Sequence, residues 1–318
     1  MKTNLIPQER TRSGGFAHPA LLYRGSDAYL AGTVPFITQG LDRGEPVAVA
    51  VPGPNLALLE KALGDRAGEV RLLDMTLAGR NPGRIIPGVL RAFADAHPDR
   101  RARIIGEPIW HGRSATEYPA CVQHEALINL AFAGRDATIL CPYDVDRLSP
   151  DVLADAAATH PVLIDETGSL PSPGYDPAHT VEKWNLPLPE APDGALTLAF
   201  DDATLTEPRL AASRYAVGAG LEPGRIPDVE LAVNELATNT ILHGGGSGTL
   251  RLWTEDGHFV CELRDRGHLT DPLVGRVPVV RATPGGRGML LVNHLADLVR
   301  MHTTPAGTTL RVYFALTA

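Results

Sequence analysis

Lysine and cysteine are scarce in this chain of 318 residues, and long apolar runs are missing. Only three of the 29 basic side chains are lysines, and no lysine follows a glycine, so a phosphate-binding loop that ends in Gly-Lys is excluded. The cysteines Cys121, Cys141 and Cys261 are odd in number and widely spaced. This pattern favours reduced thiols in or near a core over a disulfide framework or a zinc site.

The sequence also contains no run of 18 or more apolar residues, which argues against a transmembrane helix. Residues 1–15 are polar and have no apolar segment of signal-peptide length, so we expect a cytoplasmic protein that does not bind a membrane. The net charge is −8, with −5 before residue 193 and −3 from there on. Neither part has the basic surplus that direct nucleic-acid binding requires.

The length allows two domains, each with its own core. Residues 166–193 contain six prolines with scattered Gly and Ser, which predicts an extended connector rather than a long regular element. We therefore predict one domain over residues 16–165, a proline-rich linker over 166–193 and a second domain over 194–318. Tyr175 and Trp184 are expected to pin parts of the linker to a domain surface.

In the first domain, apolar strand-like runs alternate with helix-length segments. Near-continuous apolar strands with helical crossovers predict a parallel sheet that is covered by helices on both faces. Ligands of such sheets bind beyond the carboxyl ends of the strands. The expected strands are Ala20–Tyr23, Pro46–Val51, Val70–Asp74, Arg103–Ile105 and Ala137–Cys141, and the expected helices are Asp27–Arg43, Asn55–Leu63, Gly83–Ala96 and Ala115–Ala133.

Polar and aromatic residues follow some of these strand ends and are candidates for binding a ligand. Glu107 and Trp110 come after the fourth strand, and Tyr143 and Asp144 come after the fifth. His18 lies at the other end of the sheet, just before the first strand, where a histidine that caps or packs the strand is an equally good interpretation. For Glu107 and Glu125, the favoured interpretation is an ordinary solvated carboxylate.

In the second domain, a predicted helix within residues 230–246 ends in a run of glycines. Within it, Glu235 and Asn239 are four residues apart, so they share one helix face. A carboxylate and a carboxamide presented together before a flexible turn can serve as a proton acceptor and a Mg²⁺ ligand. Such pairs are also common on solvated helix faces, and the interpretation therefore depends on the sequence that follows.

Three motifs that contain glycine follow this helix in order. A short alternating strand ends at Asp265, ahead of Gly267, and a buried carboxylate there can accept a hydrogen bond from an exocyclic amine such as that of adenine. The cluster PGGRGM (residues 284–289) opens an apolar helix, whose N-terminal amides and dipole favour phosphate. The chain closes with Gly-Thr-Thr (residues 307–309) at the start of a final strand.

The four ordered motifs resemble those of the GHKL-type ATPases, and most closely the branch of anti-sigma-factor serine kinases. Residues 234–244 are similar to the N box of that family, 265–267 to its first glycine box and 286–288 to its second. The resemblance covers residues 196–316. It implies an α+β fold in which helices lie on one face of a mixed sheet.

The resemblance also implies a role for each matching residue. Glu235 would be the general base for the acceptor hydroxyl, Asn239 would bind Mg²⁺, and Asp265 would bind the adenine amino group of ATP. The other matching positions would shape the adenine pocket, leave the backbone free for the phosphates or support the adenine side: Gly267, Gly286, Gly288, Thr308 and Thr309.

Two positions in this region need a separate interpretation. The family commonly has a second glycine two residues after the first in Asp-x-Gly-x-Gly, and here that position is Leu269. The loop after Asp265 is therefore expected to be stiffer, or nucleotide affinity lower, than in the family. His243 matches the usual His-Gly ending of the N box, although a residue that closes the helix near its C-terminus is the favoured interpretation.

The first domain resembles the MEDS sensory domain. The matching segments are HPALLY (residues 18–23), GEPIW (106–110), QHEALIN (123–129) and ILCPYD (139–144). They span most of residues 16–160. The resemblance implies a sensory role on a RecA-like α/β core without a phosphate-binding loop, and it leaves the sensed ligand open.

Three functions remain open at this point. The first is an ATP-dependent protein serine/threonine kinase that acts on an anti-anti-sigma protein of the STAS type and sequesters a sigma factor, under control of the sensory domain. The second is a nucleotide-gated sequestering protein without phosphotransfer, which Leu269 favours. The third is a histidine kinase, because His124-Glu125 mimics an H box, although no heptad-patterned hairpin is present. By resemblance, a homodimer is also an expectation.

Overall fold

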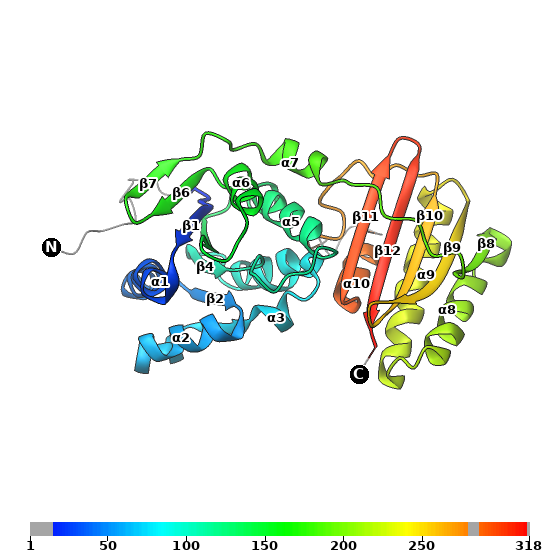
Figure 1. Ribbon diagram of the computed structural model, residues 1–318, viewed down its shortest axis with the longest axis horizontal. Helices are drawn as coiled ribbons and strands as arrows, with labels where there is room; N and C mark the ends of the chain where they lie inside the picture. Colours follow the sequence, from blue (N-terminus) through cyan, green and yellow to red (C-terminus); the bar gives the residue numbers. More distant parts are fainter. Residues whose placement is uncertain (1–14, 279–285, 317–318) are drawn as a thin grey trace. The chain divides into compact units, whose positions relative to one another are not determined.

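The structure is a computed structural model that describes residues 15–278 and 286–316. It divides into two compact units, Met1–Trp184 and Asn185–Ala318 (Figure 1). No helix in the described part of the chain has both the length and the apolar character needed to cross a bilayer.

The first unit contains a seven-stranded sheet in the order β3-β2-β4-β5-β1-β6-β7. All neighbouring strands are parallel except β6 and β7, which form an antiparallel pair at one edge. The strands are β1 Pro19–Tyr23, β2 Val47–Val51, β3 Arg71–Asp74, β4 Ala102–Gly106, β5 Ala137–Asp144, β6 Val162–Asp165 and β7 Gly168–Pro171. The helices are α1 Gly25–Asp42, α2 Gly53–Leu63, α3 Met75–Ala78, α4 Ala92–Asp95, α5 Tyr118–Ala131, α6 Pro150–Thr159 and α7 Pro177–Lys183, with a π-helical stretch at Ile86–Arg91.

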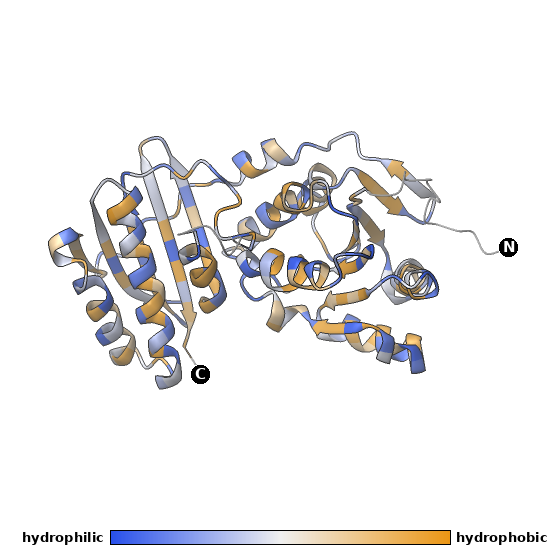
Figure 2. Cartoon of the chain, turned by 180° about the vertical axis from the view of Figure 1, so that it is seen from behind, coloured by the Kyte–Doolittle hydropathy of each residue, from blue (hydrophilic) through white to orange (hydrophobic). Residues whose placement is uncertain are grey.

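Helices cover both faces of this sheet, as the sequence predicted. Strand β2 consists of five buried apolar residues, in keeping with a strand covered on both sides (Figure 2). Leu140 of β5 packs in a core with Phe36 of α1 and Leu59 of α2. The next residue, Cys141, points to the opposite face because side chains alternate along a strand, and there it lies near Glu125 of α5.

The proline-rich segment is more regular than the sequence predicted. We expected an extended connector over residues 166–193, and instead β7 and α7 lie within it, so the first unit continues to Trp184. Its prolines are compatible with this structure because Pro177 occupies the first turn of α7, where its missing N–H is not needed. The side chain of Asp176 caps the same helix by accepting from the His179 N–H at 3.0 Å.

Trp184 attaches the end of α7 to the first unit. Its indole N–H donates to Asp155 Oδ1 at 3.3 Å, and its ring meets that of Tyr118 edge-on at 5.2 Å between centroids. The pinning role that the sequence suggested for Trp184 is therefore observed. Tyr175 is 39% exposed, so it is only partly packed against this surface.

The second unit contains a five-stranded sheet in the order β11-β12-β10-β9-β8. The sequence predicted a mixed sheet, whereas all four pairings are antiparallel. Tight turns join β9 to β10 and β11 to β12, and such turns can connect only antiparallel neighbours. The strands are β8 Leu196–Asp201, β9 Ser247–Glu255, β10 His258–Asp265, β11 Leu298–Thr304 and β12 Gly307–Ala315, and the helices are α8 Glu207–Gly218, α9 Ile226–His243 and α10 Gly288–Leu295.

Helices α8, α9 and α10 contribute to a core on one face of the sheet, which confirms the α+β class. Leu250 of β9, Leu263 of β10 and Leu310 of β12 belong to that core. Val233 of α9 and Val292 of α10 pack with them and are fully buried. The nucleotide motifs of the sequence therefore belong to strands and helices that share one core.

The opposite face of this sheet is partly covered by the first residues of the unit (Figure 1). Asn185 Nδ2 donates to the Thr303 carbonyl at 2.7 Å, and the Pro189 carbonyl accepts from Arg311 Nη2 at 2.5 Å. Arg311 in turn donates through Nε to Glu262 Oε2 at 3.0 Å, and that carboxylate is fully buried. Residues 185–190 of the predicted linker are therefore a layer of the second unit.

Candidate functional site

Glu235 and Asn239 lie on one face of α9 and point toward the start of α10. The first residue of α10 is Gly288, and a Cβ atom placed there would lie 2.6 Å from Glu235 Oε2 and 3.4 Å from Asn239 Nδ2. The predicted shared face is thus observed. A Cβ atom at this position would force the Glu235 carboxylate to move, so glycine lets that side chain keep its place beside the start of α10.

Asp265, at the end of β10, is held by two donors. Its Oδ2 accepts from the Thr240 hydroxyl at 2.8 Å, and its Oδ1 accepts from the Gly267 N–H at 2.9 Å. Thr308 lies opposite Asp265 in the ladder between β10 and β12, and its hydroxyl donates to the Gly267 carbonyl at 2.7 Å. These bonds fix the orientation of the carboxylate, which keeps further acceptor capacity for a ligand.

A cavity of about 400 Å³ joins these residues to the start of α10. Its wall combines apolar side chains with a few convergent polar groups, as is typical of small-molecule sites. The lining residues from α9 to the end of β10 are Leu236, Asn239, His243, Gly244 and Asp265, those of the following loop are Gly267, His268, Leu269 and Val274, and those of α10 and β12 with their approaches are Gly286, Gly288, Met289, Thr308 and Leu310.

The cavity separates two residues that the sequence could not distinguish. Thr308 lines it, whereas Thr309 is not among the lining residues, because alternate residues of β12 point to opposite faces of the sheet. Glu235 is also outside the lining, although it contacts the edge of the cavity through Gly288. Residues 284 and 285 of the second glycine motif lie outside the described residues.

Several residues of the site carried no signal in the sequence. Val274 and Met289 supply apolar wall, and His268 belongs to the loop after the first glycine motif. Gly275 has a φ of +70°, and a Cβ there would lie 2.7 Å from that of Met289. The Gly275 carbonyl accepts from Asn293 Nδ2 of α10 at 3.0 Å, which ties this loop to the helix.

The residues present fit ATP with Mg²⁺. The Asp265 carboxylate is suited to an exocyclic amine, and the apolar residues beside it are suited to the faces of a flat ring. The glycine at the start of α10 leaves its backbone amides open to an anion. Asn239 supplies a carboxamide oxygen, a ligand type that Mg²⁺ accepts together with phosphate and water.

We expect Gly267→Ala to weaken ATP binding by at least about tenfold, since about 1.4 kcal/mol corresponds to that factor. A Cβ there would lie 2.6 Å from the His243 carbonyl oxygen and 2.9 Å from the Cα of Gly244. Backbone atoms would have to move, and the Asp265 acceptor would move with them. Calorimetric titration checks this, with Gly218→Ala at the end of α8 as the control, because a Cβ there meets nothing within 4 Å. Equal affinity in both variants would contradict the expectation.

In the first unit, Glu107 lies beyond the carboxyl end of β4, where the sequence placed a ligand site. The expectation of a solvated carboxylate is wrong for this residue, which is 3% exposed, and equally for Glu125 of α5, which is 0% exposed. Asn55 Nδ2 donates to the two carboxyl oxygens of Glu107 at 2.9 and 3.1 Å, and the Tyr23 hydroxyl is 3.5 Å away. Burial raises the pKa of Glu107 to about 8.

The other ligand candidates of this unit do not gather around Glu107. His18 is buried on the face that α5 covers, and the ring of Tyr143 meets that of His160 edge-on on the same face. Trp110 is covered by the Arg113 guanidinium, 3.9 Å from its ring centroid. His18 and Tyr143 thus share one place, since both rings meet that of His160. Glu107 lies apart from them with Asn55 and Tyr23.

We expect Glu107→Gln to flatten the pH dependence of stability. The folded protein keeps the Glu107 proton up to about pH 8, whereas the ordinary pKa is 4.5, so folding loses free energy as the pH rises through this interval. The effect is on the order of a few kcal/mol, since each pKa unit corresponds to about 1.4 kcal/mol. Thermal melts of both proteins from pH 5 to 8 measure it, and parallel curves would contradict it.

Comparisons with known proteins agree with the two units. Residues 17–161 match the family model described as "MEthanogen/methylotroph, DcmR Sensory domain", or MEDS. Residues 198–314 match the model of the histidine kinase-like ATPase domain. The second unit is therefore a domain of an ATP-binding class, with the GHKL-like fold that the sequence predicted. The chain as a whole is a MEDS domain followed by a histidine kinase-like ATPase domain.

The solved structures that are similar to part of this chain include the following three. The RsbU and RsbW domains of Rv1364c from Mycobacterium tuberculosis share 18% identity at a TM-score of 0.31, over 40% of this chain and 34% of that one. The SiaB-SiaC complex from Pseudomonas aeruginosa shares 17% sequence identity at a TM-score of 0.30, over 38% of this chain and 89% of that one. The histidine kinase AdeS from Acinetobacter baumannii shares 11% sequence identity at a TM-score of 0.23, over 39% of this chain and 68% of that one. No curated protein sequence matches the chain.

Proposed function

We propose that this protein is an ATP-dependent protein serine/threonine kinase of the anti-sigma type. The observation that carries the proposal is the cavity of about 400 Å³, in which Asp265 and Asn239 both take part while Glu235 contacts its edge at Gly288. This arrangement supports an adenine acceptor, a Mg²⁺ ligand and a proton acceptor around one bound nucleotide.

In the proposed reaction, each residue has one task. The acceptor hydroxyl attacks the γ-phosphorus of ATP and gives its proton to the Glu235 carboxylate, while the bond from that phosphorus to the β-phosphate oxygen breaks and ADP leaves. Mg²⁺, when bound at Asn239, neutralises phosphate charge. Asp265 orients the adenine, and Gly288 allows the phosphates and Glu235 to approach the same helix start.

The proposed substrate is a STAS-type anti-anti-sigma protein, and the sequestered partner is a sigma factor. The MEDS domain would bias this activity by favouring one of two states of the protein. The role is thus transcription regulation through signal transduction, in the cytoplasm and as a homodimer. This assignment rests on the anti-sigma resemblance of the motifs and on the family match of the second unit.

A nucleotide-gated sequestering protein is the second candidate, and one observation favours it. Leu269 occupies the place of the second glycine and lines the cavity. Its N–H donates to the Thr303 hydroxyl at 3.0 Å, which in turn is 2.7 Å from the Thr308 hydroxyl. A loop held in this way is stiff, as the sequence predicted. A protein that uses ATP only to change its affinity for a partner does not need this loop to move for phosphotransfer.

A histidine kinase is not favoured. His124 lies in α5 of the first unit and is 1% exposed. A phosphate acceptor must reach the γ-phosphate of a bound nucleotide, and a side chain buried inside a separate α/β core cannot do so without unfolding.

Asn239→Ala is expected to remove most of the Mg²⁺ dependence of ATP binding. Loss of one protein ligand to the cation should cost about as much binding free energy as loss of a hydrogen bond to a charged group, about 1.5–3 kcal/mol. This corresponds to a roughly 10- to 100-fold lower affinity for ATP in the presence of Mg²⁺. Calorimetric titration with and without Mg²⁺ measures this, and Asn234→Ala on the same helix, outside the cavity, is the control. No ATP binding by the unaltered protein would overturn the kinase and leave an ATPase fold used for protein contacts.

A further inference from the structure

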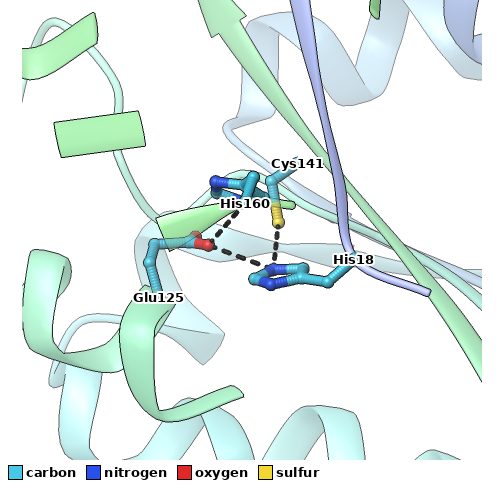
Figure 3. A group of neighbouring side chains, drawn as sticks. All are labelled: His18, Glu125, Cys141 and His160. Carbon is cyan, nitrogen blue, oxygen red and sulfur yellow. Dashed lines mark hydrogen bonds and ion pairs between the residues drawn. The ribbon is translucent and has the colours of Figure 1, made fainter. Parts of the chain in front are cut away.

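Four side chains capable of binding a metal converge inside the first unit (Figure 3). His18 precedes β1, Glu125 belongs to α5, Cys141 to β5, and His160 lies between α6 and β6. All four are buried, with exposures of at most 1%, and one ligand atom from each lies within 4.8 Å of the others. No described residue of the ATP site takes part in this cluster.

The hydrogen bonds around the two histidines fix their tautomers. Nδ1 of His160 is 2.8 Å from the Ala156 carbonyl oxygen, which can only accept, so the proton is on Nδ1. Nδ1 of His18 is 3.2 Å from Asn129 Oδ1. The amide of Asn129 donates through Nδ2 to the Thr159 carbonyl at 2.8 Å, so Oδ1 is the acceptor and His18 also carries its proton on Nδ1.

Both Nε2 atoms therefore carry a lone pair, and both lie close to the same carboxylate oxygen. His160 Nε2 is 3.1 Å and His18 Nε2 is 3.3 Å from Glu125 Oε2, and Cys141 Sγ is 3.4 Å from His18 Nε2. Neither carboxylate oxygen has a donor in hydrogen-bond geometry within the described part of the chain. With both histidines protonated on Nδ1, the Cys141 thiol is the one weak donor that these acceptors have within the described part of the chain. A buried group of acceptors with so little donor capacity is unfavourable, and a cation at the centre removes the conflict.

The ligand set and the spacing fit a tetrahedral ion. Bonds of about 2.0–2.3 Å to nitrogen, oxygen and sulfur place neighbouring ligands of a tetrahedron roughly 3.3–3.8 Å apart. Three of the six separations, 3.1, 3.3 and 3.4 Å, lie at or close to this range, and the other three are within 4.8 Å, so small side-chain movements would complete the tetrahedron. Two imidazoles, a thiolate and a carboxylate are ligands of zinc, and the Nδ1 bonds are the supporting contacts that metal-bound histidines make.

We propose that His18, Glu125, Cys141 and His160 form a buried site for a divalent transition-metal ion of the zinc class. The charges balance, because one thiolate and one carboxylate neutralise the ion. The sequence had favoured a simple reduced thiol for Cys141, and this proposal replaces that interpretation. The bound ion would tie α5 to β5 and to the segments that begin β1 and β6, so metal loading would stabilise the sensory unit.

The test uses the full chain, purified from cells grown with zinc and analysed for metal content. A chelated sample is then titrated with Co²⁺, which reports thiolate ligation through a charge-transfer band. We expect one equivalent of metal, the charge-transfer band, and a higher melting temperature with Zn²⁺. Cys141→Ser should abolish the band and weaken binding by more than the roughly 10- to 100-fold that loss of a supporting contact costs.

Cys261→Ser is the matched control, because Cys261 is equally buried but belongs to the second unit. It should keep both the stoichiometry and the band. If Cys141→Ser does not fold, the proposal is tested by the unaltered protein alone, through its number of bound metal ions per chain and its Co²⁺ charge-transfer band. The proposal is overturned if the folded protein carries no zinc and shows no thiolate band with Co²⁺, or if Cys141→Ser retains the band.

Discussion

Asp265→Asn is expected to weaken ATP binding by roughly 10- to 100-fold, the factor that corresponds to the 1.5–3 kcal/mol of a hydrogen bond to a charged group. The carboxylate already accepts from the Thr240 hydroxyl and the Gly267 N–H. An asparagine has a single acceptor oxygen, so its amide N–H group would face either one of these donors or the exocyclic amine of adenine. An amide N–H group that faces the Gly267 N–H or the adenine amine places donor against donor in a half-buried site, whereas the Thr240 hydroxyl can turn to accept.

Calorimetric titration with ATP measures this loss, and circular dichroism shows whether the variant is folded. The matched control is Asp256→Asn, which makes the same change in the turn at the opposite end of β10. Asp256 has a φ of +46°, a conformation that asparagine tolerates, so this variant should bind ATP like the unaltered protein. Equal affinity of the Asp265 variant would show that the nucleotide does not use this carboxylate.

Glu235→Gln is expected to lower phosphotransfer by about 10²- to 10⁴-fold, the usual contribution of a general base. Glutamine has the same shape, so the contact with Gly288 and the packing of α9 on α10 should persist. ATP affinity should therefore change little. If the protein is a kinase, the Glu235→Gln variant should still bind ATP but no longer transfer phosphate efficiently. If it is a sequestering protein, neither the variant nor the unaltered protein transfers phosphate.

Transfer of labelled phosphate from ATP to recombinant STAS-type proteins is the measurement. Glu230→Gln provides the control on the same helix, because Glu230 accepts from the Ser213 hydroxyl of α8 at 2.6 Å, and a glutamine oxygen can still accept there. Full transfer by the Glu235 variant would remove this residue from the chemistry. ATP binding without transfer in the unaltered protein would favour the sequestering function.

Much of the first unit could be predicted from the sequence because its strands are continuous apolar runs. Strand β2, for example, is apolar throughout and was predicted to within one residue of its bounds. The sequence did not predict helix α7, because its segment is rich in proline and lacks the apolar periodicity of an amphipathic helix. Its formation depends on a cap from Asp176 and on the packing of Trp184 against Tyr118, which no local pattern reveals.

In the second unit, glycine and carboxylate motifs located most of the cavity. Glycines are visible in a sequence because a residue with a Cβ atom does not fit a close approach to backbone such as that at Gly267. The apolar wall gave no such signal, since Val274 and Met289 could equally belong to any core. The choice between Thr308 and Thr309 required the register of β12 against β10, which a motif alone does not contain.

The sequence by itself determined the class of each unit and the order of the nucleotide motifs, because these depend on local periodicity and on residues with special backbone properties. Only the tertiary structure decided that Glu107 is buried and that His18, Glu125, Cys141 and His160 meet. The first and last of these four are 142 positions apart in the sequence and carry no common spacing. Their convergence follows from placing β1 between β5 and β6 under α5, and strand order is a property of the whole fold.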